Sequence, residues 1–400
     1  MPQGLAKRLS FIAPSMTMKV SAKAALLRAQ GVDVVSFSAG EPDFDTPSHI
    51  KEAAKRALDA GATKYTAVEG TPQLRKAVAT WFAKAHGFDV SAGEVMVSAG
   101  AKQVIHHAFH ALLDVGDEIL LPAPCWVSYA EIAKLAGAVP VPVLGRAEDG
   151  FLVNPDAIAR AITPATRMIV LCSPSNPTGA IYDEDTLRAI ASLVLKHDLW
   201  LLSDDIYRSL CYGGRRCVQP ATFAPAIRER TIIVDGVSKA YAMTGWRIGF
   251  ALAPTHVIEA MATLQGQSTT NAAAVCQAAA LAAIEGPSDE MEAMRLEFDK
   301  RRQYMVAALR AMPGVTCIEP QGAFYAFPDV SAFLGRISPQ GLRIEDDLAL
   351  CQYLIEDAKV AVVPGSAFFA PGFVRLSYAT AQANIEKGLA RMAASLAKLK

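Results

Sequence analysis

The sequence predicts an α/β protein with a mostly parallel central sheet, helices on both faces, and a second, smaller α+β domain. Three observations support this prediction: the length of the chain, the alternation of apolar runs with helical patterns, and a change of pattern in the last third. A chain of 400 residues exceeds what one hydrophobic core usually holds, so we expect two domains. Hydrophobic residues make up 52% of the chain, which is enough for a sizeable core.

Short apolar runs bounded by turn residues mark the expected strands of the large domain. They cover residues 94–98, 118–121, 167–171, 200–203, 231–234 and 249–252. Helical patterns lie between most of these runs, and the clearest cover residues 102–113, 183–197 and 255–264. Continuous apolar strands that alternate with helices indicate a largely parallel sheet covered on both faces.

The last third of the chain has a different pattern. The expected elements are a long charged helix, two strands and a closing helix, at residues 289–312, 323–327, 373–377 and 381–399. We therefore expect a large domain at residues 45–290 and a small domain made of residues 1–44 and 291–400.

Charge and cysteine content exclude several classes of protein. The 39 basic and 39 acidic residues balance, so there is no electrostatic reason to expect a nucleic acid or a membrane as partner. Seven cysteines without a C-x-x-C pair fit buried thiols in a reducing compartment better than a disulfide framework or a zinc site. We expect no signal peptide, because Pro14 interrupts the apolar stretch near the N-terminus, and the alanine-rich segment 271–284 is too short to span a bilayer. These features predict a soluble, cytoplasmic protein.

Residues that carry chemistry gather where the predicted parallel strands end, which is where α/β sheets bind ligands. After the first strand, Gly100 and Ala101 precede a helix whose N-terminus could hold a phosphate, although an ordinary turn is the plainer interpretation. After the third strand, the string S-P-S-N-P-T-G holds the Asn176 amide in a loop of fixed shape. Turn formers are common in loops, but the full string is far more specific than its composition.

Two further strand ends carry ionisable groups. Asp204 follows the fourth strand, where a carboxylate beside a buried core could hold a protonated ring nitrogen; a solvated loop acid is the plainer interpretation. Lys239 follows the fifth strand among small and apolar residues. Desolvation lowers the pKa of a lysine and makes it a Schiff-base nucleophile, although most lysines lie on the surface. Ser238 and Arg247 lie close to Lys239 in the sequence and suit a phosphate.

Taken together, these groups fit one ligand. Pyridoxal 5′-phosphate combines a phosphate, a pyridine nitrogen, a phenolic oxygen and an aldehyde, and it requires a lysine together with an acidic partner for the ring nitrogen. Each group has an ordinary structural explanation alone, but the set predicts a pyridoxal-phosphate site.

Ordered sequence strings connect the chain to a known family. They are S-A-G-E-P-D-F-D-T-P at 38–47, T-K-Y at 63–65, S-P-S-N-P-T-G at 173–179, S-D-D-I-Y at 203–207, S-K-A-Y-A-M-T-G-W-R-I-G at 238–249 and V-R-L-S-Y-A at 374–379. Over nearly its whole length the sequence resembles the class I, fold-type-I pyridoxal-phosphate-dependent aminotransferases, in the branch of the bacterial-type aspartate aminotransferases. The resemblance implies ping-pong transfer of an amino group from an L-amino acid, with aspartate expected first, to 2-oxoglutarate.

The resemblance also implies roles for individual residues. Lys239 would bind the cofactor covalently and move the substrate proton, Asp204 would pair with the ring nitrogen, and Tyr207 would bond the phenolic oxygen. Asp205 is the weaker candidate for the ring nitrogen, because the family places the acid three residues before the tyrosine. The other implied cofactor contacts are Gly100, Ala101, Lys102, Trp126, Asn176, Ser238, Arg247 and, from the neighbouring subunit of a homodimer, Tyr65.

Substrate contacts follow from the same resemblance, and they are Gly40, Trp126, Asn176, Arg375, Lys102, Ser15 and Thr17. Arg375 would bind the substrate α-carboxylate, and an arginine inside an apolar strand is unusual enough to favour such a function. Lys102 matches a lysine with which the bacterial branch meets a second carboxylate. Ala13 stands where members that accept prephenate carry a lysine, which argues against prephenate as a substrate.

Other interpretations remain open beside this one. His106, His107 and His110 could suggest a metal, but no H-E-x-x-H pattern is present, so we expect packed helix residues and no metal. A cofactor-binding transcription regulator would need an N-terminal DNA-binding domain, and the family strings already begin near Ser38. Among enzymes, one alternative is an aminotransferase of broader specificity that accepts aromatic amino acids, alanine, glutamate or prephenate. The other is a different reaction on the same cofactor, such as β-elimination.

Overall fold

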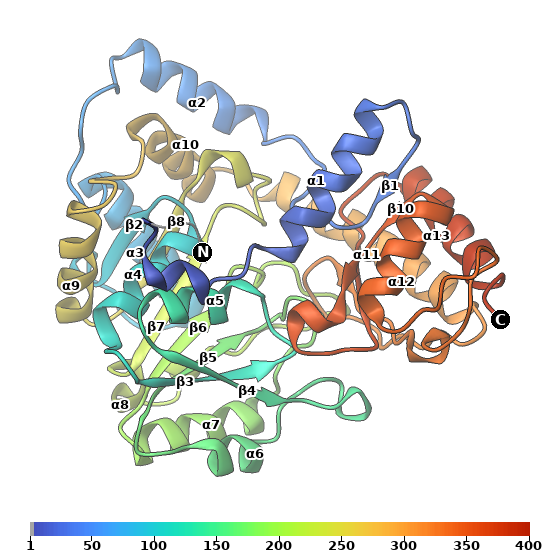
Figure 1. Ribbon diagram of the computed structural model, residues 1–400. Coiled ribbons are helices and arrows are strands. Elements are labelled where there is room, and N and C mark those ends of the chain that lie inside the picture. Colours follow the sequence, from blue (N-terminus) through green and yellow to red (C-terminus); the bar gives the residue numbers. More distant parts are fainter. Residues whose placement is uncertain (1–3) are drawn as a thin grey trace.

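The computed structural model describes residues 4–400 and is built around a seven-stranded sheet (Figure 1). In the order β2-β8-β7-β6-β5-β3-β4, every pair of neighbours is parallel except those that include β8. The strands are β2 (Val95–Ser98), β3 (Glu118–Ala123), β4 (Val139–Leu144), β5 (Thr166–Cys172), β6 (Trp200–Asp204), β7 (Thr231–Gly236) and β8 (Gly249–Leu252). The predicted α/β class with a mostly parallel sheet is confirmed.

Helices cover both faces of this sheet. They are α2 (Ser48–Asp59), α3 (Pro72–His86), α4 (Ala101–Leu112), α5 (Ser128–Leu135), α6 (Pro155–Ala161), α7 (Glu184–Lys196), α8 (Pro225–Arg228), α9 (Thr255–Gly266) and α10 (Ala274–Glu285). Successive side chains of a strand point to opposite faces. In β3, Ile119 and Leu121 therefore join the buried cluster that contains α4 and α5, whereas Leu120 joins the cluster of α6 and α7.

The edge strand β4 is absent from the strands that the sequence predicted. Its sequence V-P-V-P-V-L contains Pro140 and Pro142, which lack the N–H groups that a central strand needs. At the edge of the sheet only one side is paired, to β3, so prolines are tolerated there. The α7 prediction, by contrast, differs by one residue at each end, and Asp183 is the N-cap whose carboxylate accepts the Thr186 N–H at 2.8 Å.

The remaining elements form the smaller part of the molecule, on the right in Figure 1. They are α1 (Met16–Ala29), β1 (Val35–Ser36), α11 (Asp289–Arg310), β9 (Tyr325–Ala326), α12 (Asp347–Tyr353), β10 (Val360–Ala361), β11 (Val363–Pro364), β12 (Val374–Ser377) and α13 (Gln382–Leu396). Short 3-10 helices cover Lys7–Ser10, Ala92–Glu94, Ala147–Asp149, Pro220–Thr222, Thr244–Trp246, Ser331–Phe333 and Gly365–Phe368, and a π-helical turn covers Leu354–Ala358. Within residues 4–400, no helix combines the length and apolar character that crossing a membrane requires.

The N-terminal segment packs with the C-terminal part of the chain. Strand β1 pairs in parallel with β10, and Val35 lies opposite Val360. Figure 1 shows α1 and β1 next to the C-terminal helices. We propose the division expected from the sequence, with a large domain at 45–290 and a small domain at 1–44 and 291–400, of which the first three residues lie outside the described part.

The residue that follows β1, Phe37, packs closely against Gly388 of α13, and this contact provides a test of the association. A Cβ on Gly388 would lie under 3.0 Å from the buried Phe37 ring. Gly388→Ala should therefore lower the free energy of unfolding by about 1–3 kcal/mol through overpacking, although alanine favours an isolated helix by about 1 kcal/mol. Urea denaturation measures the change.

The matched control is Gly266→Ala, because the nearest atom to a Cβ at that helical position, on Val68, is 3.9 Å away. This variant should be as stable as the parent or slightly more stable. Equal stability of the Gly388→Ala variant and the parent would contradict the packing of the N-terminal segment on α13.

Candidate active site

A cavity of about 990 Å³ lies at the carboxyl ends of the parallel strands and is lined by residues from both proposed domains. The expected site residues that line it are Ser15, Thr17, Gly40, Ala101, Lys102, Trp126, Asn176, Asp204, Tyr207, Ser238, Lys239, Arg247 and Arg375. Parallel strands end at the same edge of a sheet, which explains why residues far apart in the sequence meet here.

Lys239 lies three residues beyond β7, and its Nζ donates a hydrogen bond to the Gly40 carbonyl at 2.5 Å. Burial lowers the pKa of Lys239 from 10.5 to about 8, because the ammonium loses its hydration. The positive charges of Arg247 and Arg375 lower the pKa further, while nearby acids oppose the shift. A substantial fraction of this amine is therefore neutral near pH 8, and the neutral amine is the nucleophilic form.

The two neighbouring aspartates at the end of β6 lie on opposite sides of the sheet. Asp204 lines the cavity, and its Oδ2 accepts a hydrogen bond from the Tyr129 hydroxyl at 2.6 Å. Asp205 instead accepts hydrogen bonds from the Ser203 hydroxyl at 2.8 Å and the Gln219 amide at 2.7 Å. Burial raises the pKa of Asp204 to about 6 and that of Asp205 to about 7. A cation beside the Asp204 carboxylate would oppose this rise and be stabilised in return.

Arg375 of β12 is buried to 2% exposure in the cavity wall. Its Nη1 donates to Asn176 Oδ1 and its Nη2 to the Ser38 carbonyl, both at 2.9 Å. The buried Nε has no hydrogen-bond partner among the described residues. The guanidinium carbon lies 4.4 Å from the centre of the Tyr325 ring, whose hydroxyl is 2.8 Å from that of Tyr207. A buried guanidinium that bonds neutral groups and keeps a donor free suits an anionic ligand such as a carboxylate.

The N-terminus of α4 forms a cationic corner of the cavity. Gly100 is the N-cap of this helix and has φ +88°, a conformation that favours glycine. A Cβ on Gly100 would lie 2.6 Å from Nη2 of Arg247, so the absent side chain leaves room for the guanidinium. The first N–H groups of a helix lack partners within the helix and attract anions. Helix start and Arg247 together suit a phosphate.

Lys102 follows this helix start, and its side chain is partly exposed and partly buried. Its Nζ lies 4.9 Å from the centre of the Trp126 ring. Partial burial and the charge of Arg247 lower the pKa of Lys102. The ammonium is thus close to both the cationic corner and the ring that borders the cavity.

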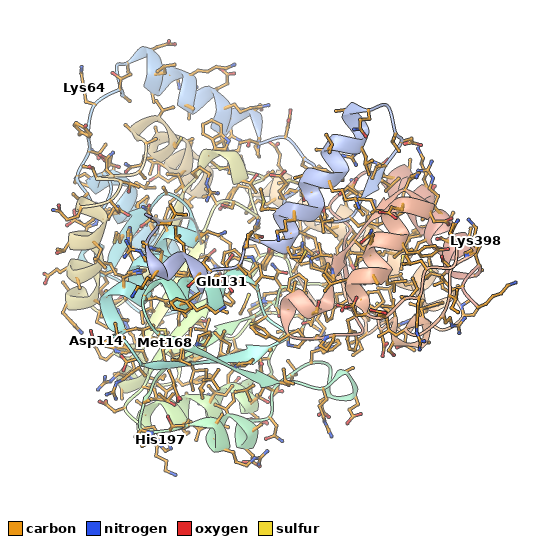
Figure 2. All side chains as sticks on the ribbon, viewed as in Figure 1. Lys64, Asp114, Glu131, Met168, His197 and Lys398 are labelled. Carbon is orange, nitrogen blue, oxygen red and sulfur yellow. The ribbon has the colours of Figure 1, made fainter. Side chains whose placement is uncertain are left out.

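Tyr65 does not reach the cavity of its own chain. It is 87% exposed and lies between α2 and α3. Figure 2 shows Lys64, the preceding residue, at one edge of the molecule and Lys398 at the opposite edge. Among the described residues, the Tyr65 side chain forms no hydrogen bond or aromatic contact that would hold it in this exposed position.

Three residues that sequence reasoning missed take part in the site: Tyr129, Tyr325 and Ser38. Tyr129 lies three residues after Trp126, at the start of α5, and this spacing was the available signal. Tyr325 lies in the predicted strand 323–327 but was not distinguished there from core aromatics. Ser38 acts through its backbone carbonyl, which no side-chain pattern reveals.

The histidines of α4 pack within the helix layer. His107 is buried, and the rings of His106 and His110 stack with centroids 4.0 Å apart. In the part of the chain that the structure describes, no group of three or more histidine, cysteine or acidic side chains is placed to hold a metal ion.

Comparison with known proteins places the chain in a family. The family model described as "Aminotransferase class I and II" matches residues 32–392 of this chain. The aspartate aminotransferase of Rhizobium meliloti (strain 1021) is 45% identical over 395 residues, which cover 98% of this chain and 96% of that protein. The aspartate/prephenate aminotransferase of Cereibacter sphaeroides is also 45% identical, over 99% of each chain.

Solved structures agree with this result. The crystal structure of the aspartate aminotransferase from Rhizobium meliloti superimposes with a TM-score of 0.95 at 44% identity and covers 99% of both chains. The aspartate aminotransferase from Thermus thermophilus, solved with maleate, gives a TM-score of 0.92 at 44% identity and covers 98% of this chain and 100% of its own. The expected fold-type-I architecture is confirmed. The chain belongs to the class I and II aminotransferases and is an aminotransferase.

Proposed function

We propose that the cavity binds pyridoxal 5′-phosphate and that the enzyme transfers the amino group of an L-amino acid, preferentially aspartate, to 2-oxoglutarate. The observation that carries this proposal is the Lys239 amine, with its pKa lowered to about 8, in one cavity with the buried Asp204 carboxyl and the Arg247 guanidinium. These groups match the aldehyde, the ring nitrogen and the phosphate of the cofactor.

The residues that are present fit this cofactor. Arg247, Ser238 and the start of α4 at Gly100 and Ala101 offer the cationic corner for a phosphate. The Asp204 carboxyl is buried and carries a raised pKa, so it gains from a cationic ring nitrogen nearby. The other expected contacts are Trp126 for ring stacking, and Asn176 and Tyr207 for the phenolic oxygen.

The chain's own residues supply binding, orientation and proton transfer. When bound, the cofactor acts as an electron sink for the carbanion that forms at the substrate Cα. Lys239 would hold the cofactor covalently, and its amine, once free of that role, would take the Cα proton as a general base and give it back as a general acid. Asp204 would hold the ring nitrogen of the cofactor in its protonated form, and Tyr129 orients the Asp204 carboxylate through the 2.6 Å hydrogen bond. Both half-reactions use one site, so donor and acceptor bind in turn.

Substrate recognition depends on two cations. Arg375 lines the cavity as a buried cation whose hydrogen-bond partners in the chain are neutral, and we assign it to the substrate α-carboxylate. Lys102 also lines the cavity and is assigned to the second carboxylate of aspartate or glutamate. The similar Thermus thermophilus enzyme was solved with maleate, a dicarboxylate, which supports this assignment. Gly40, Ser15 and Thr17 line the same cavity.

The second candidate is a broader specificity, because one 45% identical relative is an aspartate/prephenate aminotransferase. The sequence favours aspartate alone, since Ala13 offers no charge where the prephenate-accepting branch carries a lysine. Ala13 instead donates its backbone N–H to Glu131 at 2.7 Å, and Figure 2 shows Glu131 beside the N-terminal segment.

We further propose a cytoplasmic homodimer in which each subunit completes the other's site. The 87% exposure of Tyr65 supports a partner at that position. Leu5, Leu9 and Phe11 are also at least half exposed, and such apolar side chains on one segment favour a protein interface.

A panel of amino donors with 2-oxoglutarate tests the function and the role of Lys102. The parent enzyme should prefer aspartate. Lys102→Ala should reduce kcat/KM for aspartate and glutamate by about ten- to a hundredfold, because a charge-assisted contact contributes about 1.5–3 kcal/mol. The kcat/KM values for alanine and phenylalanine as donors should change little.

Lys134→Ala is the matched control, because Lys134 lies in α5 outside the cavity lining and pairs with Glu131. The Lys134→Ala variant should keep the kcat/KM of the parent enzyme for every donor. An equal loss for every donor in Lys102→Ala would assign Lys102 to the cofactor or the fold, and no turnover of any donor by the parent would overturn the proposed function.

The two aspartates at the end of β6 give a second test. Asp204→Asn removes the charge that holds a cationic ring nitrogen and should reduce kcat at least about a hundredfold, as expected for a lost electrostatic contact in a buried site. Asp205→Asn changes a carboxylate on the opposite side of the sheet, so its kcat should fall much less. Single-turnover kinetics with aspartate measures both, and a larger loss in Asp205→Asn would reverse the assignment.

Mixed dimers test whether Tyr65 acts on the neighbouring subunit. Tyr65→Ala and Lys239→Ala chains with different affinity tags are coexpressed, and the heterodimer is purified. If Tyr65 acts across the interface, one site keeps both residues, and about half of the parent activity per dimer is expected. An inactive heterodimer would show that Tyr65 acts within its own chain, and an active monomer in sedimentation would refute the dimer.

A further inference from the structure

A pair of cysteines lies in the loop that follows β6, away from the active-site cavity. Cys211 and Cys217 are six positions apart in the sequence C-Y-G-G-R-R-C, and their Sγ atoms are 3.1 Å apart. A disulfide bond is about 2.05 Å long, so a movement of about 1 Å joins the two sulfurs. The sequence pattern did not reveal the pair, because the spacing is not C-x-x-C.

The loop is built to bring the two cysteines together. Gly213 and Gly214 have φ values of +62° and +71°, which favour glycine and reverse the chain direction. The Arg215 N–H donates to the Tyr212 carbonyl at 3.2 Å and closes the turn. The chain on either side therefore returns to the same place without any covalent link.

A second cavity, of about 500 Å³, borders the pair and shares no lining residue with the active-site cavity. Its charged side chains are Arg208, Arg215, Arg216, Arg295, Asp205 and Glu292, so positive charges outnumber negative ones. Burial lowers the pKa of the neighbouring His86 to about 3, so this histidine adds no charge. Arg208 pairs with Asp235, and Arg295 pairs with Glu292.

The two remaining arginines, Arg215 and Arg216, are exposed and lie between the cysteines in the sequence. Neither forms an ion pair within 4.0 Å among the described residues. Both line this cavity, so their charges favour an anion there.

The environment favours the thiolate form of Cys211. The neighbouring Cys217 thiol lowers the pKa of Cys211, and Arg295 and Arg208 act in the same direction. The same contact raises the pKa of Cys217. One sulfur is thus the better nucleophile, and the other keeps its proton until the second step, as thiol–disulfide exchange requires.

We propose that Cys211 and Cys217 are a thiol–disulfide exchange site that accepts low-molecular-weight disulfides carrying carboxylates. The Cys211 thiolate attacks one sulfur of the small disulfide, and the departing thiolate takes up the proton that Cys211 released. Cys217 then attacks the Cys211 sulfur in the mixed disulfide, and the second thiolate leaves with the Cys217 proton. Two protein thiols are oxidised to one disulfide, and the small disulfide is reduced to two thiols.

Peptide mapping of the holoenzyme after incubation with glutathione disulfide tests this proposal. Trypsin cleaves at Arg215 and Arg216, so peptides 209–215 and 217–228 remain joined only when the disulfide has formed. After the free thiols are alkylated, the joined peptides should be found in the oxidised sample and should disappear after reduction. The control is Cys276, a partly buried cysteine outside this loop, which should remain alkylated. Separate, alkylated peptides at every ratio of oxidised to reduced glutathione would overturn the proposal.

The charge preference is tested with a pair of disulfides. Intact-mass analysis gives the rates of oxidation by anionic glutathione disulfide and by cationic cystamine at low ionic strength. The ratio of the two rates should fall about tenfold in the Arg215→Gln/Arg216→Gln variant, because electrostatic attraction changes encounter rates by this order or more. An unchanged ratio would contradict the role of the arginines, and equal oxidation of Cys276 would make the reaction non-specific.

Discussion

Burial of the Lys239 amine among cationic groups is the interaction on which the active site depends. An ammonium in this position loses hydration and lies in the same cavity as Arg247 and Arg375, so its pKa falls to about 8. The neighbouring Glu41 and Asp204 limit the shift. The same cations that make the amine reactive suit the two anionic groups of the proposed ligands, a phosphate and a carboxylate. Nucleophile activation and anion binding therefore have one electrostatic origin.

The parallel sheet provides the geometry for this interaction. The ends of β2, β3, β5, β6 and β7 meet at one edge, and each contributes a residue or a turn to the cavity. Because consecutive residues at the end of β6 lie on opposite sides, Asp204 lines the active-site cavity and Asp205 lines the second cavity. The cysteine loop follows the same strand, so one strand end supplies residues to both cavities.

The sequence predicted the fold class and most of the sheet, because buried parallel strands are continuous apolar runs. Strand β4 was not predicted, because its prolines argue against a central strand. They are tolerated at the edge of a sheet, and which strand lies at the edge depends on the whole topology. Most of the expected site residues line one cavity, because motif residues at strand ends have their positions determined by the sheet. Tyr129 and Tyr325 were missed, because a tyrosine in a helix or an apolar strand differs from a core aromatic only through the partner of its hydroxyl.

The identity of the covalent lysine is the central claim, and chemical trapping tests it most directly. The holoenzyme is reduced with sodium borohydride and digested, and the modified peptide is sequenced by mass spectrometry. The account predicts one cofactor-labelled residue, Lys239, because its lowered pKa and its position in the cavity set it apart from surface lysines. Label on Lys102, the other lysine of the cavity, or no label at all on a cofactor-loaded protein, would contradict it.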